Sequence, residues 1–250
     1  MEPISIKTEA EIEKMIVGGK KLSRVKTKLR EKVAAGVSAY EIETLADTLI
    51  KEEGAKASFK LVEGYSWATC ININDGLVHG IPKREIVFKK GDVVSVDVGL
   101  FYDGLHTDTS FSVDLDGSKE IKKFLSVGQE ALGLAIKKAR VKGRIFDISE
   151  AIEEKIKGAG FTPIRALVGH GVGKSLHEEP SIPCFTSGTR EESPEILPGM
   201  VLAIEVMYTQ GSPEIVRESD GWTISTRDGK IASLFEETVA ITPQGPIVLT

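Results

Sequence analysis

The chain has 250 residues, of which 41% are hydrophobic and 28% charged, as in a globular protein with a sizeable core. The net charge of −5 gives no basic surface for nucleic acid, and no apolar run is long enough to span a bilayer. Two cysteines cannot form a disulfide framework and the first residues lack an apolar signal segment, so we expect a cytoplasmic protein without membrane or nucleic-acid partners.

Two helices are predicted at the start of the chain, each introduced by a capping box. Residues 8–11 (TEAE) precede apolar residues at helical spacing, and Gly36 is expected to end this helix. Residues 38–41 (SAYE) begin the second helix, which Gly54 is expected to stop. A strand over 67–73 and a turn at 74–76 follow.

A hairpin is predicted next, with strands over 93–101 and 106–114 and a turn at 102–104. Asp97 and Asp108 lie nearly symmetrically about this turn, so we expect them to be close neighbours across the ladder. His106 follows the turn and is interpreted as a surface residue or as one that supports the site from outside.

Two further helices are expected, one over 118–141 and one capped by residues 147–150 and ending near 158–160. The rest reads as strand and loop. Basic runs at 26–30 and 137–140 are interpreted as solvated helix faces. No linker interrupts the sequence, so we expect one domain over 1–250.

A faint internal repeat relates residues 91–98 (GDVVSVDV) to 199–206 (GMVLAIEV). In each copy a glycine precedes an apolar strand and an acid stands six residues later. Each copy also follows one or two predicted helices. The pattern suggests two α+β halves that share one core, each contributing acids to a central site.

Acidic residues interrupt segments that otherwise read as buried strands, most clearly at Asp97 and Glu205. A lone ionised carboxylate in such a place costs several kcal/mol, and a shared cation would offset that cost. The candidate ligands are Asp97, Asp108, His170, Glu205 and Glu236. Each residue alone has an ordinary explanation as a cap, a solvated strand face or a structural histidine. Together they form an oxygen-rich set without thiolate, which suits two divalent ions and hydrolysis.

Two more imidazoles accompany these residues. His79 lies in the segment VHGIP, and His177 lies in LHEEP seven residues after His170. Imidazoles are suited to transferring protons, or to stabilising developing charge, near neutral pH.

Several motifs resemble those of type I methionine aminopeptidases, in matching order and spacing over essentially the whole chain. They are VHGIP at 78–82, VDVG at 96–99, DTS at 108–110, GHG at 169–171, LHEEP at 176–180, IE at 204–205, DGWT at 220–223 and FEET at 235–238. The wider pita-bread peptidase superfamily shares the metal pattern. The VHGIP segment and the short chain favour the methionine enzymes over Xaa-Pro peptidases.

The resemblance implies an α+β pita-bread fold, in which two pseudo-symmetric halves surround a central curved antiparallel sheet. It implies two divalent ions (Co, Mn, Fe or Zn) held by Asp97, Asp108, His170, Glu205 and Glu236, with a bridging hydroxide that attacks the first peptide carbonyl. Glu205 would relay the proton, His177 would stabilise the oxyanion, and His79 would contact the substrate. The substrate pocket would contain Phe59, Tyr65, Cys70 and Trp222.

The expected substrates are N-termini of nascent polypeptides, which the protein would bind at the ribosome. The protein is expected to be a monomer. The chain departs from the family at Val206, where proline is usual, and at Val62 and Leu176, where aromatic residues are common. The expected function is removal of methionine before a small second residue, with a preference that the pocket changes could relax. The alternatives are an Xaa-Pro type peptidase and a non-catalytic pita-bread binding protein.

Overall fold

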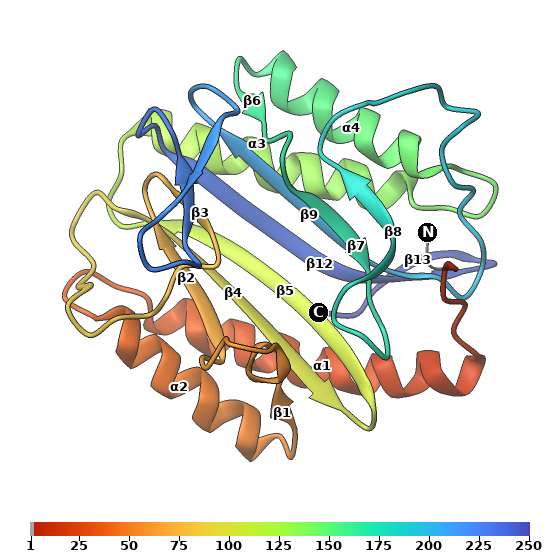
Figure 1. Cartoon of the computed structure of the whole chain (residues 1–250), viewed down its shortest axis with the longest axis horizontal. Helices are drawn as coiled ribbons and strands as arrows, with labels where there is room; N and C mark the ends of the chain where they lie inside the picture. Colours follow the sequence, from red (N-terminus) through yellow and green to blue (C-terminus); the bar gives the residue numbers. More distant parts are fainter. Residues whose placement is uncertain (1–2) are drawn as a thin grey trace.

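A large antiparallel sheet forms the centre of the protein in a computed structural model that describes residues 3–250 (Figure 1). The helices are α1 (Glu9–Lys32), α2 (Ala39–Glu52), α3 (Lys119–Lys138) and α4 (Ile145–Gly158), with a short 3-10 helix at Phe59–Leu61. The strands are β1 (Lys56–Ala57), β2 (Thr69–Ile73), β3 (Gly76–Val78), β4 (Val93–Tyr102), β5 (Leu105–Asp114), β6 (Thr162–Pro163), β7 (Val168–Gly171), β8 (Glu178–Pro183), β9 (Val201–Thr209), β10 (Ile215–Arg217), β11 (Ile224–Thr226), β12 (Ala232–Thr242) and β13 (Gly245–Val248).

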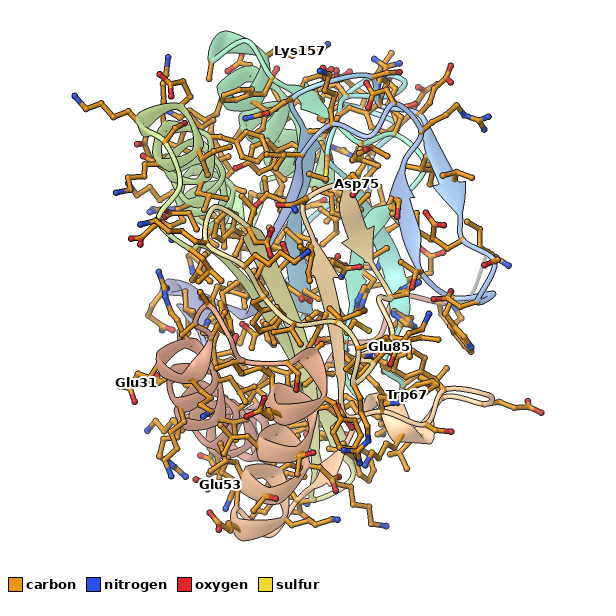
Figure 2. The ribbon with its side chains drawn as sticks, turned by 90° about the vertical axis from the view of Figure 1, so that its left-hand side faces the viewer. Glu31, Glu53, Trp67, Asp75, Glu85 and Lys157 are labelled. Atoms are coloured by element: carbon orange, nitrogen blue, oxygen red, sulfur yellow. The ribbon has the colours of Figure 1, made fainter. Side chains whose placement is uncertain are left out.

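The main path through the sheet runs β1-β4-β5-β12-β9-β7-β8, and β3, β10 and β11 form a small second sheet. Helices α1 and α2 pack on the β4–β5 half, whereas α3 and α4 pack on the β9–β12 half (Figure 1). Figure 2 shows Glu31 of α1 and Trp67 on opposite sides of the sheet. The face away from the helices is called the open face below.

The predicted capping boxes at the first two helices are confirmed. The side chains of Thr8 and Ser38 accept hydrogen bonds from the third helical N–H, and Glu11 and Glu41 bond back to the cap residues. The predicted cap of α4 is wrong. Helix α4 starts after Arg144, and the Asp147 carboxylate accepts a 2.8 Å hydrogen bond from the Arg144 N–H, so this acid lies inside the first turn.

The β4–β5 hairpin has a two-residue turn, one residue later than predicted. Asp103 and Gly104 both have positive φ, which matches the twist of a tight hairpin. Asp97 therefore pairs with Ser110, while Asp108 pairs with a glycine two positions along the strand. The two acids are diagonal neighbours on one face, which is close to the prediction because their separation still fits one site.

Two polar residues are more buried than predicted. The side chain of His106 lies in the interior, where Nδ1 is 2.9 Å from the Ser58 hydroxyl, so the surface interpretation is wrong. Lys26 is not on a solvated helix face, because its Nζ lies 2.7 Å from the Glu237 carboxylate of β12. Both contacts tie an N-terminal element to the sheet that carries the acids.

The internal repeat corresponds to β4 and β9. Gly91 and Gly199 have φ values of 91° and 89°, a backbone conformation that glycine adopts without strain. In each strand the acid is the fifth residue and lies among buried apolar neighbours. Over residues 3–250, no helix has both the length and the apolar character that crossing a bilayer requires.

Candidate active site

Strand register aligns acids across the middle of the sheet. Cys70 pairs with Asp97, Asp97 with Ser110, Ser110 with Glu236, and Glu236 with Glu205, from β2 across to β9. Directly paired residues in an antiparallel sheet project from the same face. These side chains therefore form one row.

The remaining ligand candidates belong to the same face because strand side chains alternate. Asp108 lies two residues before the Ser110 of that row, and His170 pairs with Ala203, two residues before Glu205. All of the predicted ligands thus project toward one place.

This place is the open face of the sheet. A Cβ atom added to Gly128 of α3 would lie 2.7 Å from the Phe235 side chain, so Phe235 faces the helices. Its neighbour Glu236 must then point away from them. The helices hold the sheet from behind while the acids line its other surface.

The tightest group within the site combines two acids and one imidazole. Ligand atoms of Asp108, His170 and Glu236 all lie within 4.8 Å of one another, and His170 Nε2 is 3.5 Å from Glu205 Oε1. The other ring nitrogen of His170 lies 2.8 Å from the Gly171 carbonyl, to which it donates. Nε2 is consequently left with a lone pair directed toward the acids, as metal-binding imidazoles require.

The site is electrostatically unfavourable without a cation. Burial, opposed by a hydrogen bond from the Thr109 N–H, raises the pKa of Asp108 to about 7. The pKa values of Asp97, Glu205 and Glu236 are also raised, first by burial and then by neighbouring carboxylates.

Two buried carboxylate oxygens, Asp97 Oδ1 and Glu236 Oε1, have no hydrogen-bond partner in the part of the chain that the structure describes. Buried acceptors are normally satisfied. Divalent ions that prefer oxygen with one nitrogen would satisfy both atoms and neutralise the cluster, so the residues present fit a metal centre.

The two further histidines border this cluster. The His177 ring centroid lies 4.5 Å from that of His170, and His79 has a positive φ of 57°, which is uncommon for a residue with a side chain. Burial lowers the pKa of both His79 and His177, so each imidazole is neutral at pH 7. A neutral imidazole can donate one hydrogen bond and accept another.

A cavity of about 130 Å³ opens onto the acids. Its lining contains every site residue that the sequence predicted, together with three apolar positions: Phe59, Val62, Tyr65, Cys70, Val78, His79, Asp97, Asp108, His170, Leu176, His177, Glu205, Trp222 and Glu236. Tyr65 and Trp222 meet edge to face with ring centroids 5.0 Å apart, and the Tyr65 hydroxyl donates to the Thr69 carbonyl at 2.9 Å. Acids therefore line the bottom of the cavity. Its side is lined by apolar residues, called the apolar wall below, which are Phe59, Tyr65, Cys70, Leu176 and Trp222.

Some supporting residues were not predicted. The Thr238 hydroxyl accepts from the Asp108 N–H at 2.9 Å and donates to the Asp108 carbonyl at 2.7 Å. The Glu43 carboxylate accepts from the N–H groups of Ala68 and Thr69, which hold the start of β2. An acid beside the apolar Ile42 of α2 was the only sequence signal for the Glu43 contact. Thr238 lies in the FEET motif, but the motif gave no indication of its hydrogen bonds to Asp108.

Comparison with known proteins identifies relatives over nearly the full chain. The model of metallopeptidase family M24 matches residues 13–243. A methionine aminopeptidase of Aquifex aeolicus is 41% identical, over 99% of this chain and 98% of that protein. One from Bacillus subtilis is 37% identical, over 99% of both.

Solved structures agree with this grouping. The crystal structure of a methionine aminopeptidase from Thermotoga maritima matches with a TM-score of 0.96 and 40% identity, over 99% of both chains. A prolidase from Pyrococcus furiosus matches with a TM-score of 0.78 and 23% identity, over 98% of this chain and 65% of that one. The second likeness shows the pita-bread fold alone and confirms the predicted α+β class.

Proposed function

The chain belongs to metallopeptidase family M24, in its methionine aminopeptidase group, and we propose that it removes N-terminal methionine from new polypeptides by metal-dependent hydrolysis. The observation that carries this proposal is the meeting of buried acids with a narrow apolar cavity on the open face. The acids supply a place for cations, and the cavity supplies a place for one apolar side chain.

We assign the metal ligands to the five residues that project from the open face, with two divalent ions between them. Asp97 and Asp108 lie on β4 and β5, and His170 and Glu205 lie on β7 and β9. Glu236 lies on β12, the strand between β5 and β9. When bound, such ions would lower the pKa of water, polarise a carbonyl and bind the free α-amine of a chain terminus. The need for a free amine would restrict cleavage to the first residue.

The remaining roles fall to side chains of this protein. Glu205, whose carboxylate lies 3.5 Å from His170 Nε2, would accept and return a proton during hydrolysis. His177 is neutral and can donate a hydrogen bond to the carbonyl oxygen as negative charge develops on it. His79 borders the same cavity and would hold the scissile amide.

The apolar wall would receive the methionine side chain. Phe59, Tyr65, Cys70 and Leu176 form one buried cluster, against which Trp222 packs. Cys70 pairs directly with Asp97 in the strand register, so the apolar wall adjoins the row of acids. Because the cavity is small, we propose that a small second residue is preferred.

The test is turnover of a peptide panel by metal-depleted protein to which Mn²⁺, Fe²⁺, Co²⁺ or Zn²⁺ is added. Met-Ala-Ser should be cleaved, whereas peptides with another first residue or a large second residue should be cleaved more slowly. Asp108→Ala should abolish turnover, and Asp116→Ala, at an exposed acid, should not.

The result also decides between this function and its alternatives. Cleavage mainly of Xaa-Pro peptides would indicate the other specificity of the fold. No metal binding and no turnover with any ion would indicate a binding protein. We further propose that the enzyme works as a monomer in the cytoplasm, on polypeptides emerging from the ribosome.

A further inference from the structure

The outer edge of β9 has a gap beside Glu205. On the side away from β12, β7 pairs with β9 at Leu202 and Ala203, and β6 pairs with it at Tyr208 and Thr209. Between these pairs, no strand within residues 3–250 pairs with the Glu205 carbonyl or the Met207 N–H. Buried main-chain groups without partners are rare because each one is costly.

One thiol fills this gap. Cys184, the first residue after β8, donates its S–H to the Glu205 carbonyl at 3.3 Å and accepts the Met207 N–H at 3.4 Å. The Cys184 side chain is fully buried. A single side chain thus takes the place of a missing strand at two successive outward-facing positions of β9.

These contacts fix the main chain that carries a proposed metal ligand. The two bonded groups lie on either side of Val206, whose own partner is Phe235 of β12. Because hydrogen bonds hold both edges of this segment of β9, the main chain fixes the direction of the Glu205 Cα–Cβ bond. That direction places the carboxylate 3.5 Å from His170 Nε2.

We infer that Cys184 is a positioning residue for Glu205, an inference that rests on the proposed role of Glu205 as ligand and proton carrier. Cys184 is not among the residues that line the cavity, so the thiol takes no chemical part in the proposed reaction. It acts through the peptide groups of Glu205 and Met207.

The test uses three substitutions at this position in the full-length protein. Cys184→Ala removes both hydrogen bonds, Cys184→Val removes them while keeping the core filled, and Cys184→Ser retains a donor and an acceptor. Manganese affinity is measured by titration calorimetry on metal-depleted protein, independently of turnover. The turnover number and KM are measured separately with Met-Ala-Ser.

The alanine and valine variants should each lose about 10- to 100-fold in manganese affinity or in kcat, as is usual when support of a ligand is removed. KM should change little, because the apolar wall is not touched. The serine variant should recover most of the loss. Ile182→Val, in the same core on β8, should lose stability without losing manganese affinity.

The inference is overturned if the alanine and valine variants keep wild-type affinity and kcat, or if the serine variant loses as much as they do. It is also overturned if Ile182→Val shows the same loss of affinity. Absence of manganese binding and turnover in the wild-type protein would instead contradict the proposed function, and with it this role.

Discussion

Glu236 on β12 lies directly opposite Glu205 on β9, so the two carboxylates are neighbours on the open face. The next residue, Glu237, points to the other face, where its carboxylate lies 2.7 Å from Lys26 Nζ and accepts from the Thr250 hydroxyl at 2.7 Å. Adjacent acids in one strand therefore have opposite environments. One lies among like charges, and the other lies against a cation.

This difference predicts opposite effects of the same substitution. Glu236→Gln removes one buried carboxylate from the cluster, so it should raise the melting temperature of metal-depleted protein and abolish turnover. Glu237→Gln breaks a partly buried ion pair, so it should lower the melting temperature with or without metal. Thermal unfolding in EDTA and in Mn²⁺ checks both. A fall in melting temperature for Glu236→Gln in EDTA would contradict the proposed crowding of charge.

The stability of metal-depleted protein should depend on pH. The pKa of Asp108 is raised from its ordinary value of 3.8 to about 7, chiefly by burial. A raised folded-state pKa gives a contribution to stability that is complete below pH 3.8 and is lost as pH rises through about 7. The melting temperature of metal-depleted protein should therefore fall between pH 5 and pH 8, relative to Asp108→Asn.

Bound metal should reverse this pH dependence, so that the stability of the metal-loaded protein rises with pH. Because bound cations require deprotonated carboxylates, manganese binding near pH 6.5 should release protons. Titration calorimetry in two buffers with different ionisation enthalpies measures that release. Equal heats in the two buffers would show that the carboxylates are already ionised, contrary to the expectation.

The N-terminal segment is tied to the loop that carries His177. Lys7 Nζ lies 2.6 Å from the Glu178 carboxylate, and their side chains are only 3% and 12% exposed. Removing one partner of a buried ion pair usually costs about 3–5 kcal/mol, since the other charge is left unpaired. Lys7→Met should lower the free energy of unfolding by roughly that amount.

A matched control exists on helix α1. Lys14 pairs with Asp103 at 2.9 Å, but about half of each side chain is exposed. Exposed ion pairs contribute at most about 1 kcal/mol, so Lys14→Met should have little effect. Urea unfolding of both variants provides the comparison. A similar loss of unfolding free energy in the two variants would contradict the expectation that the buried ion pair contributes more than the exposed one.

The apolar wall should set substrate preference. Leu176 is buried against the cavity, and an apolar contact of this size usually changes discrimination by about 1–3 kcal/mol. Leu176→Ala should therefore weaken the preference for methionine over a first residue with a bulkier side chain. Ratios of kcat/KM for the two peptides measure this. Leu197→Ala, at an exposed leucine, should leave the ratio unchanged.

The sequence alone determined the starts of the first two helices, the β4–β5 hairpin and the types of residue at the site. Capping boxes are local signals, because the bonded groups are three residues apart, and they placed the first residues of α1 and α2 correctly. The acids at Asp97 and Glu205 were also readable, because charged residues within apolar strands are costly wherever the strands pack.

Tertiary structure decided which groups meet. The row from Cys70 to Glu205 depends on register among strands far apart in sequence, and a shift of one residue would turn the acids toward the helices. The buried position of His106, the partly buried ion pair of Lys26 and the thiol that completes the edge of β9 have the same origin. Such contacts join residues that are distant along the chain, so the local sequence pattern does not predict them.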